Sequence, residues 1–373
     1  MLATLILEDG TVYKGEQFGA FGTKIGEIVF NTSMTGYQEI LTDPSYANQI
    51  IVMTYPEIGN YGINEEDFES IGPRCLGMIV KNACKNDSHY KSKETISKYL
   101  ERNGIIGIEG IDTRSLTIKI REKGVMKCMV TTDAIFTDDD ITQRIAAICI
   151  HKADKDIVFK VTTNEPYVVN PDGEIDLALI DYGTKQGIVN SLAERGCKVT
   201  VYPAGIDSKT ILENGHKCLF LSNGPGDPAD CEFEIKTIEE LIGKIPIFGI
   251  CLGYQLLSIV LGAKTYKLKY GHRGGNHPVI NIQTGKVMVT SQNHGYAVDR
   301  NTLSGIMLET YKNLDDDTME GFSSERLKIY AVQFHPEAKP GPTDASVIFD
   351  EWIELMKEYQ KLPVRKADDM VNV

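Results

Sequence analysis

A cysteine at position 251 stands between two glycines, in the stretch Gly249-Ile-Cys-Leu-Gly253. The residues before it, Ile245 to Ile250, form a short apolar run typical of a buried parallel strand, and from Tyr254 onward apolar residues recur at helical spacing. A nucleophile between two glycines at a strand-to-helix turn is the pattern of a nucleophile elbow, because glycine allows a sharp turn and a close approach of neighbouring backbone. The turn places the sulfur at the positive end of a helix, which favours the thiolate. The pattern predicts a nucleophilic cysteine, with a buried structural cysteine as the alternative.

His335 and Glu337 can supply the base that a thiol nucleophile needs. They follow Lys328–Phe334, whose apolar residues predict a strand. Pro336 disfavours helical backbone at His335, and in an extended chain residues two apart point to the same side. Glu337 is therefore expected to lie behind the imidazole and orient it, as an acid orients the base in nucleophilic catalysis.

The other six histidines give weaker signals. Three of them lie in polar, turn-like stretches and are expected to be exposed: His89, His151 and His216. A metal pair of His272 and His277 is disfavoured, because their loop offers no carboxylate or thiol at ligand spacing; solvated or hydrogen-bonded side chains are favoured instead. His294, between Asn293 and Gly295, fits a ligand contact or a turn equally well.

Length and composition limit the class of protein. A chain of 373 residues favours two domains, and the net charge of −13 without a basic block argues against a nucleic-acid partner. No apolar run approaches the ~20 residues of a membrane span, and the first ten residues resemble a strand more than a signal peptide. The eight cysteines are scattered and never spaced C-x-x-C, which argues against a disulfide scaffold and a zinc site and favours a reducing cytoplasm.

Residues 1–152 are expected to form a small α+β domain. Its elements are predicted from local periodicity and turn signals: strands at 2–8, 11–13, 26–31 and 49–54, and helices at 95–102, 115–122 and 141–149. The segment 32–46 is polar and turn-rich, so we expect irregular chain there with an exposed hydroxyl on Ser45. These patterns favour packing or docking over catalysis for this domain.

The pattern changes after a linker expected at 153–173, where periodicity fades. From residue 174 to 361 strands and helices alternate: strands at 177–182, 198–202, 217–222 and 245–250, and helices at 186–195, 208–213 and 234–243. This alternation predicts an α/β fold with a doubly wound parallel sheet, whose sites lie at the carboxyl ends of its strands. Antiparallel strands are expected beyond residue 262, at 264–269, 278–282 and 287–291, followed by a helix at 345–358 and a tail at 362–373.

A glycine-rich turn, Ser222-Asn-Gly-Pro-Gly-Asp-Pro228, ends the third of these strands. It is not a dinucleotide fingerprint, but it can aim a backbone N–H at the target of the sulfur. Together with the Gly249–Gly253 and His335–Glu337 motifs, it resembles the class I, triad-type glutamine amidotransferases. Three N-terminal segments, 31–46, 55–60 and 110–114, narrow the resemblance to the small subunits of carbamoyl-phosphate synthases, over about residues 1–360.

The resemblance implies a flavodoxin-like glutaminase domain that supplies ammonia to a separate large subunit, in a heterodimer that can assemble further. The large subunit would bind ATP, Mg²⁺ and bicarbonate and make carbamoyl phosphate for pyrimidines and arginine, with no cofactor in this chain. The family's nucleophile falls on Cys251, its general base on His335 and the orienting carboxylate on Glu337. Its glutamine contacts fall on Ser45, Gly224, Gly226, Leu252, Gln255, Asn293, Gly295 and Tyr296.

Two residues depart from the family pattern. Tyr254 stands where the family often has histidine, and Tyr296 where it often has phenylalanine. The tyrosine at 254 removes a possible second imidazole beside the sulfur, which raises a question about the tuning of the thiol. Two alternatives remain: another amidotransferase or γ-glutamyl hydrolase with the same triad, and a catalytically silent scaffold, which would require a broken triad.

Overall fold

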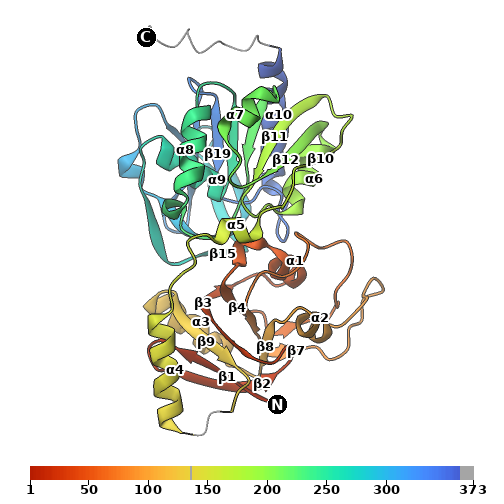
Figure 1. Cartoon of the computed structure of the whole chain (residues 1–373), viewed down its shortest axis with the longest axis vertical. Helices are drawn as coiled ribbons and strands as arrows, with labels where there is room; N and C mark the ends of the chain where they lie inside the picture. The colour runs from red at the N-terminus through yellow and green to blue at the C-terminus, as the bar shows by residue number, and fades with distance from the viewer. Residues whose placement is uncertain (135–136, 362–373) are drawn as a thin grey trace. The chain divides into compact units, whose positions relative to one another are not determined.

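The computed structural model describes residues 1–134 and 137–361 and divides into two compact units (Figure 1). Unit 1 contains Met1–Asp154 together with Lys269–Gly274, and unit 2 contains Lys155–Leu268 and the chain from Gly275 onward. The tail expected at 362–373 lies outside the described residues.

Unit 1 is built on a closed barrel of seven strands in the order β1-β2-β8-β6-β4-β3-β9. These are β1 (Leu2–Leu7), β2 (Val12–Gln17), β3 (Thr23–Asn31), β4 (Gln49–Met53), β6 (Gly77–Ile79), β8 (Ile106–Glu109) and β9 (Met126–Thr131). Closure leaves no free strand edge, and one core cluster gathers fully buried residues from six of the strands, such as Leu5, Ile28 and Ile106. The strands expected at 2–8 and 11–13 are confirmed as β1 and β2, which pair antiparallel.

Three helices of unit 1 begin at side-chain caps that the sequence shows. They are α2 (Ile96–Arg102), α3 (Thr113–Lys123) and α4 (Asp138–Ile150), and they are capped by the side chains of Thr95, Asp112 and Thr137. Two short strands, β5 (Glu57–Ile58) and β7 (Asn82–Ala83), pair with each other.

The prediction that residues 32–46 are irregular holds for 32–36, which form no helix or strand, but is wrong for 37–46. Residues 37–46 form the helix α1 (Tyr37–Thr42) and the 3₁₀ turn Pro44–Tyr46, because Tyr37, Ile40 and Leu41 recur at helical spacing and bury their side chains. Ser45 is buried at 7% exposure, not exposed as expected, and its N–H donates to the Asp43 carboxylate at 2.8 Å.

Residues Lys269–Gly274 come from the C-terminal half of the sequence but fold with unit 1. The N–H of Val125 donates to the Lys269 carbonyl at 2.8 Å, and the N–H of Thr32 donates to the Arg273 carbonyl at 3.1 Å. The ring of Tyr270 stacks on Phe30 with centroids 5.8 Å apart. The sequence patterns did not indicate this excursion, because pairing between residues far apart in the chain leaves no local period.

Unit 2 contains a ten-stranded sheet in the order β10-β12-β11-β13-β14-β19-β18-β17-β15-β16. Five neighbouring strands are parallel: β12 (Cys197–Pro203), β11 (Ile175–Asp181), β13 (Cys218–Leu221), β14 (Ile247–Ile250) and β19 (Ile329–Val332). The others are β10 (Tyr167–Val169), β18 (Met319–Ser324), β17 (Leu308–Asn313), β15 (Thr265–Asn281) and β16 (Val287–Val298). The predicted parallel α/β sheet is confirmed.

Two hydrophobic clusters lie on opposite faces of this sheet, because successive strand residues point to opposite sides. The first cluster includes residues of α7 (Ser208–Glu213), α8 (Glu232–Leu241) and α9 (Leu252–Val260) (Figure 1). The second includes residues of α6 (Gln186–Glu194) and α10 (Val347–Gln360). Helices on both faces make the sheet doubly wound.

Several elements of unit 2 differ from the sequence prediction. The stretch 153–173, expected as a linker, contains α5 (Ile157–Val161) and β10, which pairs with β12. Both elements are too short to show a period. β17 and β18 were not predicted, and the two strands expected at 264–269 and 278–282 are parts of one strand, β15.

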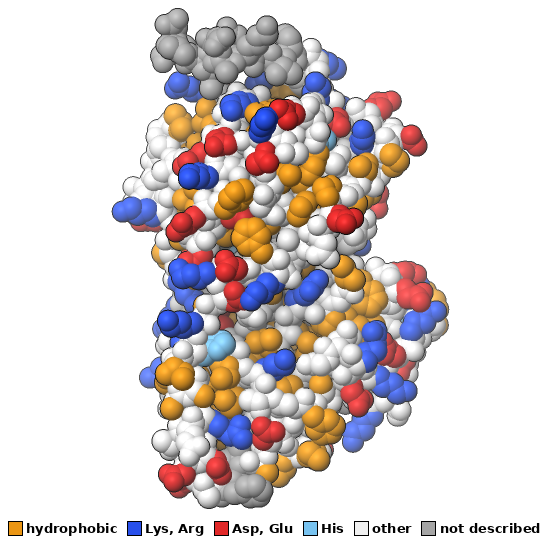
Figure 2. Space-filling model, in the orientation of Figure 1, with side chains coloured by type: hydrophobic (Ala, Val, Ile, Leu, Met, Phe, Trp, Pro, Cys, Tyr) orange, Lys and Arg blue, Asp and Glu red, His pale blue; other side chains and the backbone are white. Residues whose placement is uncertain are grey.

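None of the helices in the described chain combines the length and apolar composition needed to cross a bilayer. On the face shown in Figure 2, acidic and basic side chains are interspersed, so that face carries no basic stripe of the kind that tracks a phosphate backbone.

Candidate active site

Cys251 occupies a strained turn between β14 and α9. Its backbone has φ 53° and ψ −103°, a conformation that few non-glycine residues adopt and that is typical of a nucleophile elbow. A Cβ on Gly253 would lie 2.3 Å from the Leu221 carbonyl oxygen, and one on Gly249 would lie 2.9 Å from the Gly253 carbonyl carbon. Both flanking glycines are thus required by close packing, and the expected strand–turn–helix geometry is confirmed.

The sulfur of Cys251 lies at the N-terminus of α9 in a site almost closed to solvent, where the residue is 2% exposed. The N–H of Cys251 donates to the Val332 carbonyl at 2.9 Å, which ties the elbow to the end of β19. Its Sγ is 3.7 Å from the carbonyl oxygen of Asn293 on β16. The helix N-terminus gives the sulfur a positive electrostatic environment.

His335 and Glu337 follow β19 and are buried, at 1% and 8% exposure. Nδ1 of His335 lies 2.6 Å from Oε1 of Glu337, so the two side chains share one side of the chain as the proline between them predicts. The backbone N–H of His335 donates to the Ser291 carbonyl at 2.9 Å. The imidazole also interacts with the Cys251 thiol, while in the described chain Nε2 of His335 is buried without a hydrogen-bond partner. We refer to Cys251, His335 and Glu337 together as the row.

A lysine that the sequence analysis missed completes this row. Nζ of Lys185 lies 2.7 Å from Oε1 of Glu337, and the lysine side chain is only 2% exposed. The lysine stands at the start of α6, where its backbone N–H donates to Oδ1 of Asn223 at 3.0 Å. No local signal marks it, because a lysine in a polar turn is ordinarily solvated.

The charges in the row determine which protonation states are favoured. Burial by itself disfavours the imidazolium, but the Glu337 carboxylate and the interaction with Cys251 raise the pKa of His335 to about 10. Burial also disfavours the Glu337 carboxylate, yet Lys185 and His335 lower the pKa of Glu337 to about 2. At neutral pH the buried site therefore holds an imidazolium against a carboxylate.

The glycine-rich turn 222–228 packs directly against the elbow. A Cβ on Gly224 would lie 2.4 Å from the Tyr182 carbonyl oxygen and 2.8 Å from Cδ2 of Leu252. Gly226 has φ 98°, which favours glycine. The N–H of Gly253 donates to the Ser222 carbonyl at 3.0 Å, which holds the turn against the first residues of α9. The N–H of Leu252 belongs to the helix turn whose donors have no acceptor within the helix.

The remaining predicted glutamine contacts lie on α9, on β16 and in unit 1. Gln255, one turn beyond Cys251, donates from Nε2 to the Tyr296 carbonyl at 3.0 Å and to Oε1 of Gln333 at 2.9 Å. The strand β16 carries Asn293, Gly295 and Tyr296, and the carbonyl oxygen of Asn293 lies 3.7 Å from Sγ of Cys251. Ser45 lies in unit 1, in the 3₁₀ turn Pro44–Tyr46.

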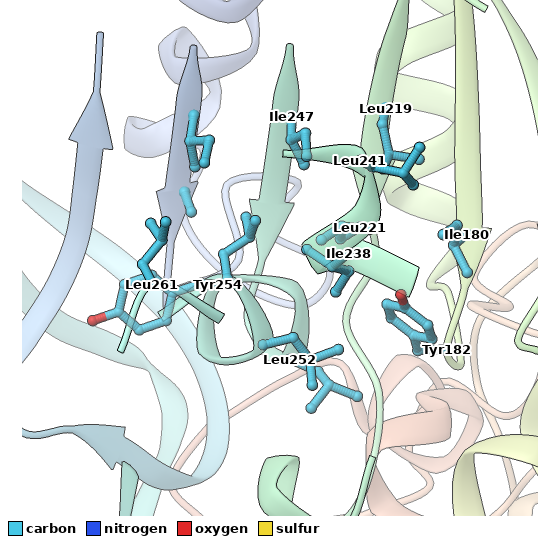
Figure 3. Packing of buried hydrophobic residues seen from close by; sticks show 14 of the residues in the cluster. Ile180, Tyr182, Leu219, Leu221, Ile238, Leu241, Ile247, Leu252, Tyr254 and Leu261 are labelled. Atoms are coloured by element: carbon cyan, nitrogen blue, oxygen red, sulfur yellow. The ribbon is translucent and has the colours of Figure 1, made fainter. Parts of the chain in front are cut away.

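Tyr254 does not take the place of an imidazole at the sulfur. It is fully buried in the first hydrophobic cluster (Figure 3). Cys251 belongs to the second cluster. Its hydroxyl donates to the Met319 carbonyl at 3.1 Å, and its ring packs on Phe322 with centroids 5.6 Å apart. The tyrosine is a core residue, so the question that its sequence position raised about the thiol finds no support in its contacts.

The prediction that His216 is exposed is wrong. It is buried at 8% exposure, with Nδ1 at 2.8 Å from Asp176 and Nε2 at 2.8 Å from the Tyr202 hydroxyl. His89 is exposed as expected, and His151 is half-buried. The ring of His294 lies within hydrogen-bond distance of two groups on β16, with Nδ1 2.7 Å from the Tyr296 carbonyl oxygen and Nε2 2.9 Å from Oε1 of Gln292, which favours a structural role for the ring.

Comparison with known proteins identifies first the class and then the family. Residues 178–355 match the family model for class I glutamine amidotransferases, and residues 5–130 match the model for the CPSase domain of the carbamoyl-phosphate synthase small chain. A solved glutamine amidotransferase from Thermotoga maritima aligns with 52% of this chain and 88% of its own, at 22% identity and a TM-score of 0.38.

Curated relatives match over nearly the whole chain. The carbamoyl phosphate synthase small chain of Fusobacterium nucleatum is 49% identical over 352 residues, 94% of this chain and 97% of the relative. Those of Staphylococcus haemolyticus and Bacillus caldolyticus are 47% identical over 360 and 362 residues, with at least 96% of each chain covered. The chain belongs to the family of carbamoyl phosphate synthase small chains.

Proposed function

We propose that this chain is the glutamine-hydrolysing small subunit of a carbamoyl-phosphate synthase, with Cys251, His335 and Glu337 as its catalytic triad. The observation that carries the assignment of the triad is the buried pair in which Nδ1 of His335 lies 2.6 Å from Oε1 of Glu337, together with the interaction between that imidazole and the Cys251 thiol. Family membership supports the reaction class. A catalytically silent scaffold is disfavoured, because each member of the row stands in place.

The proposed mechanism assigns one step to each of these groups. The proton of the Cys251 thiol resides on His335, because the raised pKa of His335 favours the imidazolium, and the Cys251 thiolate attacks the side-chain amide carbon of glutamine. The N–H groups of Leu252 and Gly224 stabilise the oxyanion, and one such donor is typically worth ~10²–10³ in rate. The imidazolium then protonates the departing ammonia, and water hydrolyses the γ-glutamyl thioester to glutamate. Glu337 fixes Nδ1–H on the imidazole and supports its positive charge.

Replacement of the nucleophile tests this mechanism. Cys251→Ser should abolish ammonia release while glutamine still binds, because a serine hydroxyl is a far weaker nucleophile at neutral pH. Cys149→Ser is the matched control, since Cys149 is an exposed thiol on α4, and it should retain full activity. Full glutaminase activity in the Cys251 variant would end the proposal.

The ammonia is proposed to pass to a large subunit that binds ATP, Mg²⁺ and bicarbonate and makes carbamoyl phosphate for pyrimidine and arginine biosynthesis in the cytoplasm. The names of the curated relatives support a complex of a small and a large chain. The complex co-purified with the large subunit should make carbamoyl phosphate when glutamine is added. The complex that contains Cys251→Ser should make it only from free ammonia. A γ-glutamyl hydrolase would instead be fully active alone and would make no carbamoyl phosphate.

Ser45 remains a predicted glutamine contact that rests on the resemblance. If it contacts the substrate, Ser45→Ala should raise the KM for glutamine more than it lowers kcat. An unchanged KM would contradict the assignment.

A further inference from the structure

Gln333 is a fully buried amide that neither the triad nor the predicted glutamine contacts include. It precedes His335 by two residues, and its N–H donates to the Glu320 carbonyl on β18 at 2.8 Å. Its Oε1 accepts from Nε2 of Gln255 at 2.9 Å. This bond links the elbow helix, which carries Cys251, to the segment that carries His335.

The orientation of the two amides is fixed by a backbone group. The Tyr296 carbonyl is an acceptor that cannot reverse its polarity, and it lies 3.0 Å from the terminal nitrogen of Gln255. Gln255 must therefore turn its NH₂ toward the carbonyl, and its second N–H must find another acceptor. Gln333 supplies that acceptor, so its own amide is oriented with Oε1 toward Gln255.

Two consequences follow for the site. Both N–H groups of Gln255 are used by the protein, so the atom it can offer to a substrate is its carbonyl oxygen, Oε1. Gln255 is then an acceptor, able to recognise an N–H group of a ligand. In the described part of the chain Nε2 of Gln333 is buried without a hydrogen-bond partner, so the N–H groups of this amide do not compete for Gln255.

We propose that Gln333 is a positioning residue for glutamine recognition: it holds the Gln255 amide with its oxygen toward the substrate. The proposal rests on the glutaminase function above, because it assumes that Gln255 contacts glutamine. Gln333 acts through Gln255 and takes no part in the covalent steps at Cys251.

The test is a double-mutant cycle in the full-length chain reconstituted with the large subunit. Gln333→Met keeps the volume but removes the acceptor, so the KM for glutamine should rise about 3- to 10-fold, the equivalent of one hydrogen bond, with kcat within about twofold. In a Gln255→Ala background the same substitution should change KM by less than about twofold, because its target is gone. Equal effects in both backgrounds, or no effect in either, overturn the proposal.

Two further variants separate positioning from simple disruption. Gln333→Glu retains an oxygen facing Gln255 and should restore KM to within about twofold of wild type; a rise equal to that of Gln333→Met overturns the proposal, and this variant also decides the matter if the methionine variant does not fold. Ser258→Ala removes another buried hydrogen bond of α9, from the hydroxyl to the Tyr254 carbonyl at 2.8 Å, and should leave KM unchanged.

Alkylation of Cys251 by iodoacetamide supplies a readout that needs no glutamine. Its rate should be the same in wild type and Gln333→Met, whereas displacement of the elbow would lower both this rate and kcat and overturn the positioning role. A wild-type complex that releases no ammonia from glutamine would refute the proposed function itself. A failure confined to the Gln333 variants refutes the further inference alone.

Discussion

Cys251 keeps a positive φ because several backbone bonds hold the elbow together. Its N–H is bonded to Val332, its carbonyl accepts from Gln255, and the N–H of Gly253 is bonded to Ser222. Conformations of this kind cost about 1–3 kcal/mol each and persist only where the surroundings determine them. At the scale of single residues, the site therefore consists of one strained nucleophile and a row of buried charges.

Glu337 is the residue that keeps His335 charged. Burial and the positive charge of Lys185 both favour the neutral imidazole. In Glu337→Gln the neutral amide no longer offsets these two effects, so the pKa of His335 should fall far below its value of about 10. Glutaminase kcat should drop by about 10²–10⁴, the usual value of an acid–base group. The rate of Cys251 alkylation, measured as a function of pH, should depend on pH differently in wild type and in Glu337→Gln. Glu354→Gln, an exposed substitution on α10, is the control, and identical profiles would contradict this role.

The same pair predicts how stability depends on pH. The pKa of His335 is raised from 6.5 to about 10, so its contribution is complete below pH 6.5 and is lost as pH rises toward 10. The pKa of Glu337 is lowered from 4.5 to about 2, so its contribution is complete above pH 4.5 and is lost as pH falls toward 2. The Tm difference between wild type and His335→Gln should be largest between these windows and shrink from pH 6.5 to 10. A constant difference over that range would be inconsistent with a charged His335.

Lys185 should contribute more to stability than a surface lysine. Lys185→Met leaves the Glu337 carboxylate buried with one cation fewer, and breaking such a pair typically costs about 3–5 kcal/mol. Lys198→Met is the matched control, because Lys198 is 40% exposed and 4.0 Å from Asp176, where a pair is worth about 0–1 kcal/mol. Denaturant unfolding can be followed through Trp352, the one tryptophan, which packs on Phe220 and Phe248 in unit 2. An equal loss of unfolding free energy in the two variants would show that the buried ion pair contributes no more to stability than the exposed one.

At the scale of elements, the site depends on how closely α9 approaches β13. The approach is possible because Gly253 has no side chain. A Cβ at this position would lie only 2.3 Å from the carbonyl oxygen of Leu221. The helix N-terminus, the sulfur and the glycine-rich turn are therefore one packed assembly, and the chemistry is sensitive to shifts of the helix.

Gly253→Ala should displace α9 and with it the nucleophile. A misplacement of about 1 Å can cost about 10²-fold in rate, so we expect a loss of that order in glutaminase kcat together with a lower Tm. Gly305→Ala is the control, because no atom lies within 4 Å of the position that its new methyl group would take and its backbone is not in the left-handed region. Activity close to wild type in the Gly253 variant would show that the helix can move without consequence.

At the scale of the whole molecule, the two units are not two continuous halves of the sequence. The central part of β15, Lys269–Gly274, belongs to unit 1, and Arg273 there is 4% exposed. A fragment of residues 155–361 therefore lacks the groups that bond this segment in the full chain, including Val125 and Thr32.

Trypsin should detect this difference. Cleavage after Arg273 should be slow in the full chain and at least about tenfold faster in the 155–361 fragment, because proteases attack segments whose backbone bonds are lost. Lys286 lies in the exposed turn after β15 and should be cut at similar rates in both. Equal protection of Arg273 in the fragment would mean that unit 1 does not stabilise the segment.

The sequence by itself determined the nucleophile elbow, the base with its orienting acid and the alternating sheet of unit 2. Each of these is encoded over a few neighbouring residues: glycines two positions from a cysteine, a proline between His335 and Glu337, and apolar runs of fixed period. Local rules of backbone geometry are enough to read such patterns.

Only the tertiary structure decided what surrounds them. Lys185 beside Glu337, Gln333 beside Gln255, the burial of His216 and the exchange of Lys269–Gly274 into unit 1 all arise between residues far apart in the chain. A polar side chain carries the same local signal whether it ends in water or in a buried pair. Its partner is chosen by packing, which no spacing along the sequence records.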